Sequence, residues 1–240
     1  KKGHEVVVID NFSHNQPSLL DCCKYETFQV VRGDARDKNL ISKYIKDADF
    51  IIPLAAIVSA PACDRDPLMA ESLNLGAVKT ILELRRPEQK IIYPDTNSGY
   101  GVGQKDIYCD ENTPLNPISL YGRTKVEAER LILKAGNAVV FRLATVFGIS
   151  PRMRIDLLVN DFVYRAVNDR FIVLFESHFK RNYVHVRDVA GAFIYAMDNF
   201  ERMKNEPYNV GLSEANLSKL ELCEEIKKQL PDFYFVEAKI

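Results

Sequence analysis

The sequence predicts a doubly wound parallel α/β domain over residues 1–150, followed by a smaller mixed lobe over residues 151–240. In the first part, short apolar runs alternate with helix-like segments, which is typical of parallel strands joined by crossover helices. After Gly148 the alternation loosens. Because ligands of such folds bind at the carboxyl ends of the strands, we expect the functional residues there.

The predicted strands and helices are recognised by different patterns of apolar residues. The predicted strands of the first part are short runs of apolar and β-branched residues, at 5–10, 27–31, 90–94 and 138–142, with a further strand and its exit loop at 50–56. The predicted helices have apolar residues at helical spacing or follow turn residues, and they lie at 16–24, 38–46, 70–85 and 120–133. In the second part we expect helices at 155–167, 187–200 and 218–230, and extended segments at 171–175, 182–186 and 208–211.

The composition excludes several classes of protein. Hydrophobic residues make up 47% of the 240 residues, which is enough for a sizeable core. The net charge of -1 argues against a nucleic-acid partner, and no apolar run is long enough to span a membrane. The five cysteines form no CxxC pair and no metal-like spacing with histidine, so we predict reduced thiols, no bound metal and a cytoplasmic location.

Tyr121 and Lys125 are the strongest candidates for chemistry. They are four residues apart on a predicted helix, so they lie on the same face, one turn from each other. A lysine ammonium beside a phenol favours the phenolate and lowers the pKa of the tyrosine, which makes it usable as an acid or base near neutral pH. The pair alone is weak evidence, because the same spacing also occurs by chance on helix surfaces.

Two acidic residues end predicted strands. An acid at the position of Asp10 in a dinucleotide-binding fold accepts hydrogen bonds from the adenosine ribose and repels a 2′-phosphate, which favours NAD over NADP. Asp34 follows the next strand, where it is placed to hold the adenine amino group. Both positions also suit an acid that merely caps a turn. The glycine-rich phosphate loop of such a fold is expected before Glu5, and this sequence does not include it.

The sequence resembles the extended short-chain dehydrogenases/reductases. The motifs that carry the resemblance follow the family's order and approximate spacing: Asp10-Asn11-Phe12, Gly33-Asp34-Ala35, Leu54-Ala55-Ala56, Asn74, Thr96 to Gly101, Tyr121-Gly-Arg-Thr-Lys125, Phe141 to Gly148 and Arg181 to Asp188. They cover most of the chain. The similarity is greatest to the NAD-dependent nucleotide-sugar epimerase/dehydratase branch, typified by UDP-glucose 4-epimerase. It implies a Rossmann-type fold, NAD as cofactor and a nucleotide-diphosphate sugar as substrate.

The resemblance also implies roles for individual residues. The catalytic residues would be Thr96, which shares a hydrogen bond with a sugar hydroxyl, Tyr121, which takes its proton, and Lys125, which holds the ribose hydroxyls. The implied cofactor-binding residues are Asp10, Asn11, Asp34, Ala35, Leu54, Ala55, Ala56, Asn74, Tyr121, Lys125 and Ala144. The implied substrate-binding residues are Thr96, Asn97, Thr145, Arg181 and Tyr183. Arg181 is expected to pair with the diphosphate, although a plain surface arginine also fits.

The choice of reaction rests on the residues around Thr96. A 4,6-dehydratase of this branch has an Asp-Glu pair after the threonine, whereas this chain has Asn97 and Ser98, which do not titrate near neutral pH. Asp95 precedes Thr96, and adjacent strand residues point to opposite faces. Dehydration is therefore disfavoured, and two redox reactions remain. Because Asp10 favours NAD, we predict a nucleotide-sugar epimerase that works through a transient 4-keto sugar, with hydride passing to and from bound NAD.

Other reactions and the assembly follow from the same resemblance. An NAD(P)H-dependent nucleotide-4-keto-sugar reductase or dehydrogenase is the alternative function, and a 4,6-dehydratase or a non-catalytic nucleotide-binding member is less favoured. Family members commonly dimerise through two helices per subunit. We therefore expect a homodimer formed by residues 70–85 and 120–133.

Overall fold

The computed structural model describes residues 3–102 and 108–238, and the chain forms two compact units. The first unit comprises Lys1–Arg142 and Phe193–Asn209, and the second comprises Leu143–Ala192 and Val210–Ile240. The chain therefore enters the second unit after Arg142, returns to the first at Phe193, and leaves it again after Asn209. Each unit has a hydrophobic core of its own.

The strands of the first unit lie in two sheets. Strands β1 (Val6–Asp10) and β2 (Phe28–Arg32) pair in parallel, with Val8 opposite Val30. The second sheet has the order β3-β4-β5-β9 and contains β3 (Phe50–Ile51), β4 (Lys90–Thr96), β5 (Ala138–Leu143) and β9 (Glu206–Val210). Strands β3 and β4 are parallel. These parallel pairs agree with the predicted α/β fold.

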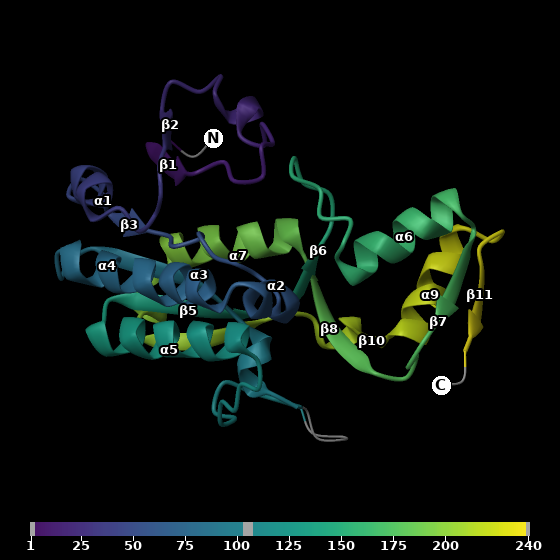
Figure 1. The fold of residues 1–240 in the computed structure, drawn as a ribbon. Coiled ribbons are helices and arrows are strands. Elements are labelled where there is room, and N and C mark those ends of the chain that lie inside the picture. Colours follow the sequence, from purple (N-terminus) through teal and green to yellow (C-terminus); the bar gives the residue numbers. More distant parts are fainter. Residues whose placement is uncertain (1–2, 103–107, 239–240) are drawn as a thin grey trace. The chain divides into compact units, whose positions relative to one another are not determined.

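The helices of the first unit follow the strands in the order expected of βα units. They are α1 (Lys38–Ile45), α2 (Ala60–Arg65), α3 (Pro67–Glu71), α4 (Ala77–Leu84), α5 (Leu120–Ala135) and α8 (Phe200–Met203). A π-helical turn at Ser72–Gly76 joins α3 to α4, so the helix predicted over 70–85 is present with one interruption. Helix α4 contacts α5, which packs on β4 (Figure 1).

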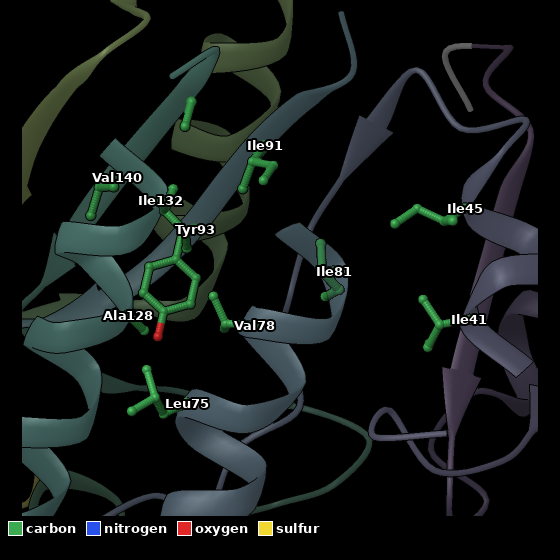
Figure 2. Packing of buried hydrophobic residues seen from close by; sticks show 11 residues of the cluster. Ile41, Ile45, Leu75, Val78, Ile81, Ile91, Tyr93, Ala128, Ile132 and Val140 are labelled. Atoms are coloured by element: carbon green, nitrogen blue, oxygen red, sulfur yellow. The ribbon is translucent and has the colours of Figure 1, made fainter. Parts of the chain in front are cut away.

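The core of the first unit fixes β4 against α4 and α5. Ile91 and Tyr93 of β4 and Ile132 of α5 are at most 1% exposed. Figure 2 shows the Tyr93 ring inside this layer, with Val78 of α4 and Ala128 of α5 in the same cluster. A close-packed interior of this kind allows little relative movement of its elements. The strand that ends in Thr96 and the helix that begins next to Tyr121 are therefore held in fixed register.

The helix predicted at residues 16–24 is absent, and this prediction was wrong. The structure has only a 3-10 turn there, Leu20–Cys22. Leu19 supplies no side-chain cap, no residue of the turn is buried, and Leu20 is 68% exposed. A short helix is marginal in water unless an apolar face packs on the core. Apolar spacing alone could not reveal that this segment has nothing to pack against.

The second unit is a mixed lobe with two small sheets. Its strands are β6 (Thr145–Phe147), β7 (Phe171–Leu174), β8 (Lys180–His185), β10 (Asn216–Ser218) and β11 (Tyr234–Glu237). Strand β8 lies between β6, which is parallel to it, and β10, which is antiparallel, while β11 pairs in parallel with β7.

Helices α6 (Leu158–Asn168) and α9 (Lys219–Gln229) pack on each other in this lobe, and α6 also packs on β7 (Figure 1). Ser218 and Glu221 form a capping box that fixes the start of α9. Helix α7 (Val186–Asp198) spans the passage of the chain back to the first unit. In the described part of the chain, no helix combines the length and the apolar character that a membrane crossing needs.

Candidate active site

Strand β4 presents Thr96 at its carboxyl end. Thr96 is 8% exposed, and its hydroxyl oxygen accepts a hydrogen bond of 3.1 Å from the backbone N–H of Ser98. The hydroxyl groups of Thr96 and Ser98 are also 3.1 Å apart. Thr96 thereby caps the 3-10 turn Asn97–Tyr100, and its hydroxyl has a fixed direction. Ser98 was not among the residues predicted for the site, although the Thr-x-Ser spacing at a strand end was a signal.

Helix α5 begins beside this turn. The Ser119 hydroxyl accepts a hydrogen bond of 3.0 Å from the N–H of Gly122 and caps the helix. A Cβ atom at Gly122 would lie 3.1 Å from the carbonyl oxygen of Ser98 and 3.0 Å from the Cβ of Pro117. The glycine thus lets the first turn of α5 approach the turn that follows β4. As a result, the half-buried Tyr121 lies near the segment that carries Thr96.

Lys125 lies buried on the same face of α5 as Tyr121. Its side chain is 4% exposed, and its ammonium donates a hydrogen bond of 2.6 Å to the carbonyl oxygen of Pro94. The nitrogen also lies 3.8 Å from the centre of the Tyr93 ring, a favourable position for a cation. Burial disfavours the charged form of Lys125 and lowers its pKa to about 8.

A buried ion pair continues this face of α5. Glu129 accepts two hydrogen bonds, of 2.6 and 3.1 Å, from the guanidinium of Arg142 on β5. The side chains are 3% and 6% exposed. Neither residue was predicted from the sequence, although Glu129 lies four residues after Lys125 and so continues the spacing of the candidate pair.

Asn74 holds the loop that follows β3. Its side-chain oxygen accepts a hydrogen bond of 2.7 Å from the N–H of Ile57, and its amide donates one of 3.0 Å to the carbonyl oxygen of the same residue. The amide also lies 3.4 Å from the hydroxyl of Thr124 on α5. Asn74 is 2% exposed, so it acts on this site through the loop, whose shape it fixes.

The loop itself is open to solvent. Leu54 is 69% exposed, Ala55 is exposed and Ala56 is half-buried. Leu54 to Ala56 follow β3 at its carboxyl end, where the ligands of parallel α/β folds bind. An apolar stretch held in this position suits the flat face of an aromatic ligand. The predicted role of these three residues in cofactor binding stays a prediction.

Asp10 and Asn11 stand exposed at the carboxyl end of β1. The Asp10 carboxylate accepts a hydrogen bond of 2.7 Å from the N–H of Phe12, and the Asn11 side chain accepts one of 3.0 Å from the N–H of Ser13. Both side chains therefore shape the turn after the strand. An exposed carboxylate with one fixed oxygen is also suited to accept hydrogen bonds from ribose hydroxyls.

The carboxylate of Asp34 accepts hydrogen bonds from the side chain of Arg36. The two side chains share hydrogen bonds of 2.5 and 2.9 Å, which lower the pKa of the Asp34 carboxyl. Ala35, between them, is half-buried. Arg36 in turn bonds the hydroxyl of Ser72 in the π-helical turn. An adenine amino group at Asp34 would have to share the carboxylate with Arg36, a competition that the sequence did not predict.

The candidates of the second unit lie on and around β6 and β8. Thr145 lies opposite Tyr183 in the parallel pair of these strands, and Arg181 is exposed on β8. Tyr183 is 2% exposed and belongs to the hydrophobic core of this unit, and burial raises the pKa of its hydroxyl. Ala144 is buried, and its N–H bonds the carbonyl oxygen of Val210. Arg181 is thus the exposed candidate, whereas Tyr183 and Ala144 are interior.

The structure brings the three predicted catalytic residues together within the first unit. Thr96 supplies a hydroxyl, Tyr121 a phenol and Lys125 a buried ammonium, all around the junction of β4 and α5. A hydroxyl and a phenol beside a fixed cation can accept a proton from an alcohol and return it. Asn97 begins the turn after Thr96 and is half-buried. Its predicted role in substrate binding stays a prediction.

The sequence matches the profile of the NAD dependent epimerase/dehydratase family over residues 1–211. CDP-paratose 2-epimerase of Salmonella typhi is 29% identical over 258 residues, and the match covers 92% of this chain and 76% of that protein. UDP-glucose 4-epimerase of Lactobacillus helveticus is 26% identical, with 95% of this chain and 75% of that protein covered.

The fold is similar to those of solved enzyme structures. The UDP-glucuronic acid 4-epimerase of Bacillus cereus, in complex with UDP-glucuronic acid and NAD, superposes with a TM-score of 0.83 at 24% identity. That match covers 98% of this chain and 77% of the other. The dTDP-glucose 4,6-dehydratase of Bacillus anthracis gives a TM-score of 0.81 at 22% identity, covering 99% and 77%. These likenesses confirm the Rossmann-like α/β fold.

Proposed function

This chain belongs to the NAD dependent epimerase/dehydratase family, and from that premise we propose that it is a nucleotide-sugar epimerase acting through a transient 4-keto sugar. The family is one of enzymes, and its cofactor is NAD. The observation that carries the proposal is the cluster of Thr96, Tyr121 and Lys125 at the junction of β4 and α5. A protein that only bound nucleotides would not need a buried lysine one helical turn from this tyrosine.

The residues present fit NAD. Asp10 offers an exposed carboxylate at the end of β1, which suits ribose hydroxyls and disfavours a 2′-phosphate. Leu54 leaves a large apolar surface open on the loop that Asn74 holds, and a dinucleotide would cover it. Lys125 supplies a buried cation. These features favour NAD over NADP.

The chain's own residues would accept the proton of the reacting hydroxyl and return it. Tyr121 accepts the proton from the C4 hydroxyl of the sugar and later returns it, while the Thr96 hydroxyl holds the same oxygen by a hydrogen bond. Lys125 binds the ribose hydroxyls and favours the phenolate of Tyr121 by its charge. Bound NAD supplies the hydride acceptor and donor. The proton and the hydride return in one cycle, so no external reductant is consumed.

Arg181 is our candidate for the diphosphate of the substrate. Its guanidinium is exposed on β8, and the planar donor pattern of arginine matches phosphate oxygens. Thr145 on β6 is proposed as a substrate residue of the second unit, and Asn97, at the turn after Thr96, as one of the first unit. The buried Tyr183 supports β8 from within the core. The chemical class of substrate is thus a nucleotide-diphosphate sugar.

Epimerisation is favoured over the other reactions of the family. A 4,6-dehydratase needs titrating groups next to the threonine, and the turn after β4 offers Asn97 and Ser98. The two curated relatives described above carry epimerase names. A 4-keto reductase is the competing function, because it would use the same three catalytic residues. The two differ in whether the cofactor is retained or exchanged.

The state of the cofactor in the purified protein tests this proposal. The protein would be denatured, and any released dinucleotide identified by mass spectrometry. We expect NAD at close to one molecule per subunit, because a recycling enzyme has no reason to release it. Nucleotide sugars would then be screened by NMR with no added cofactor. An empty protein that binds NADPH more tightly than NAD would exclude the epimerase and favour the reductase.

We also propose that the protein forms a homodimer through the helical segments 70–85 and 120–133. The outward face of α5 carries Arg123, Glu127 and Arg130, and Leu68 on the neighbouring α3 is 82% exposed. Charged residues around an exposed apolar side chain are compatible with a helix-to-helix interface. Size-exclusion chromatography with light scattering would give the mass of the assembly, and a monomer mass would contradict the proposal.

A further inference from the structure

Asp95 is a carboxyl group buried at the back of the catalytic cluster. It is 3% exposed, and neither of its oxygens has a well-formed hydrogen bond to any described residue. An ionised carboxylate in such a place would lose its hydration and gain only a weak contact with the backbone N–H of Thr96 in return, which is unfavourable. Asp95 therefore needs either a proton of its own or a cation paired with it.

The groups that face Asp95 come from three elements. Helix α5 contributes Lys125 and Glu129, and Tyr121 lies one turn away on the same face. Strand β4 contributes Tyr93, whose hydroxyl is also buried without a partner among the described residues. Arg142 on β5 faces Glu129, to which it donates from Nε and Nη2, while its Nη1 donates to the Tyr100 hydroxyl and the carbonyl oxygen of Glu111.

Pairing with a cation does not satisfy Asp95. The Lys125 ammonium bonds the carbonyl oxygen of Pro94, and in the described part of the chain it forms no ion pair with a carboxylate. The Arg142 guanidinium is directed at Glu129. The remaining neighbours are the backbone N–H of Thr96, a minor contact that favours the ionised form, and the Glu129 carboxylate, which can only accept. Two carboxyl groups that face each other are stable when one of them carries a proton and donates it to the other.

We propose that Asp95 is a positioning residue that acts through Lys125. As a neutral acid that donates to Glu129, it leaves the buried ammonium of Lys125 without a carboxylate partner. The charge of Lys125 then acts on the phenol of Tyr121 and favours the phenolate. An ionised Asp95 would compensate the same charge and weaken this effect.

The electrostatics of the cluster support this assignment. Burial, and after it the neighbouring Glu129 carboxyl, raises the pKa of Asp95 well above its ordinary value, while Lys125 acts in the opposite direction. The proposal rests on the proposed catalytic role of Tyr121. Its test reads proton positions and needs no substrate, so its failure would leave the proposed function standing.

Infrared spectroscopy of the purified protein tests the proposal. The carbonyl stretch of a protonated carboxylic acid should be present at neutral pH, and Asp95→Asn should remove it. Asp232→Asn is the matched control, because Asp232 is 81% exposed and should contribute no such band. Circular dichroism would show that each variant is folded. Retention of the band in Asp95→Asn, or its absence from the parent protein, would overturn the proposal.

The electrostatic coupling of Asp95 to Tyr121 and Lys125 is measured by the pH at which the carbonyl band of protonated Asp95 disappears. In Tyr121→Phe no phenolate can form, so Asp95 should lose its proton at lower pH than in the parent protein. In Lys125→Met a nearby cation is gone, so the band should persist to higher pH. Each shift should be roughly one pH unit, the usual size for a charge at close range. Equal midpoints in all three proteins would show that Asp95 is a structural acid only, and would refute its positioning role.

Discussion

The ammonium of Lys125 donates a hydrogen bond of 2.6 Å to the carbonyl oxygen of Pro94. This contact ties α5 to the strand that ends in Thr96, two residues after Pro94. It also fixes the end of the lysine side chain, so the position of the charge relative to Tyr121 does not depend on a bound ligand. The candidate active site is therefore largely pre-organised on two rigid elements, and pre-organised charges of this kind can stabilise charge that develops in a reaction.

Replacing Tyr121 by phenylalanine should abolish turnover and spare NAD binding. The substitution removes the hydroxyl that accepts the proton and keeps the ring, and loss of a positioned acid or base typically reduces rates by about 10²–10⁴-fold. Turnover of nucleotide sugars by NMR and retained NAD by mass spectrometry would be measured together. Tyr164→Phe, at a 51% exposed position, serves as the control. Unchanged turnover in Tyr121→Phe would refute the assigned mechanism.

Replacing Thr96 should reduce turnover in a way that serine restores. Thr96→Ala removes a hydrogen bond to an oxygen on which charge develops, worth about 1.5–3 kcal/mol, or roughly 10- to 150-fold in rate. Thr96→Ser keeps the hydroxyl and should recover most of the activity. The comparison of kcat for the two variants is the measurement. If serine failed to restore the rate, the side chain would matter for packing and not for its hydroxyl.

Lys125→Met should change how stability depends on pH. The pKa of Lys125 is about 8 in the folded protein and has its ordinary value of 10.5 in the unfolded chain, which therefore binds more protons between these two values. The free energy of unfolding of the parent protein should rise as pH increases from about 8 to about 10.5. Lys125→Met should lack this rise, and Lys134→Met, at an exposed position on the same helix, should keep it.

Urea unfolding at about pH 7 and about pH 9.5 gives that comparison directly. The same variants should separate in cofactor content, because Lys125→Met loses the cation proposed to bind the ribose and Lys134→Met does not. A parallel pH dependence in Lys125→Met and the parent protein would show that the lysine does not titrate in this window.

Glu129→Gln should destabilise the protein strongly. It leaves the guanidinium of Arg142 buried without its carboxylate, and breaking a buried ion pair from one side costs about 3–5 kcal/mol. Asp232→Asn breaks the exposed pair with Arg170, where about 1 kcal/mol or less is expected. Urea unfolding of both variants would measure the difference. Similar losses would mean that burial does not set the strength of the inner pair.

The sequence by itself determined the local elements and the order of the site motifs. Helix α5, with Tyr121 and Lys125 on one face, was predicted at 120–133 from helical spacing, and the strand that leads to Thr96 was predicted at 90–94 from its apolar run. These features depend on residues a few positions apart. The fold class also followed from the regular alternation of such elements.

The tertiary structure decided which residues, distant in the sequence, lie next to each other in space. Three features of the site join residues that are 13 to 34 positions apart. They are the contacts of Asp95, the ion pair of Glu129 with Arg142, and the hydrogen bonds of Asn74 to the loop at Ile57. The missing helix near Leu20 and the burial of Tyr183 have the same origin. Burial and charge proximity arise from packing, and no local pattern encodes them, because a residue's neighbours in space are chosen by the whole core.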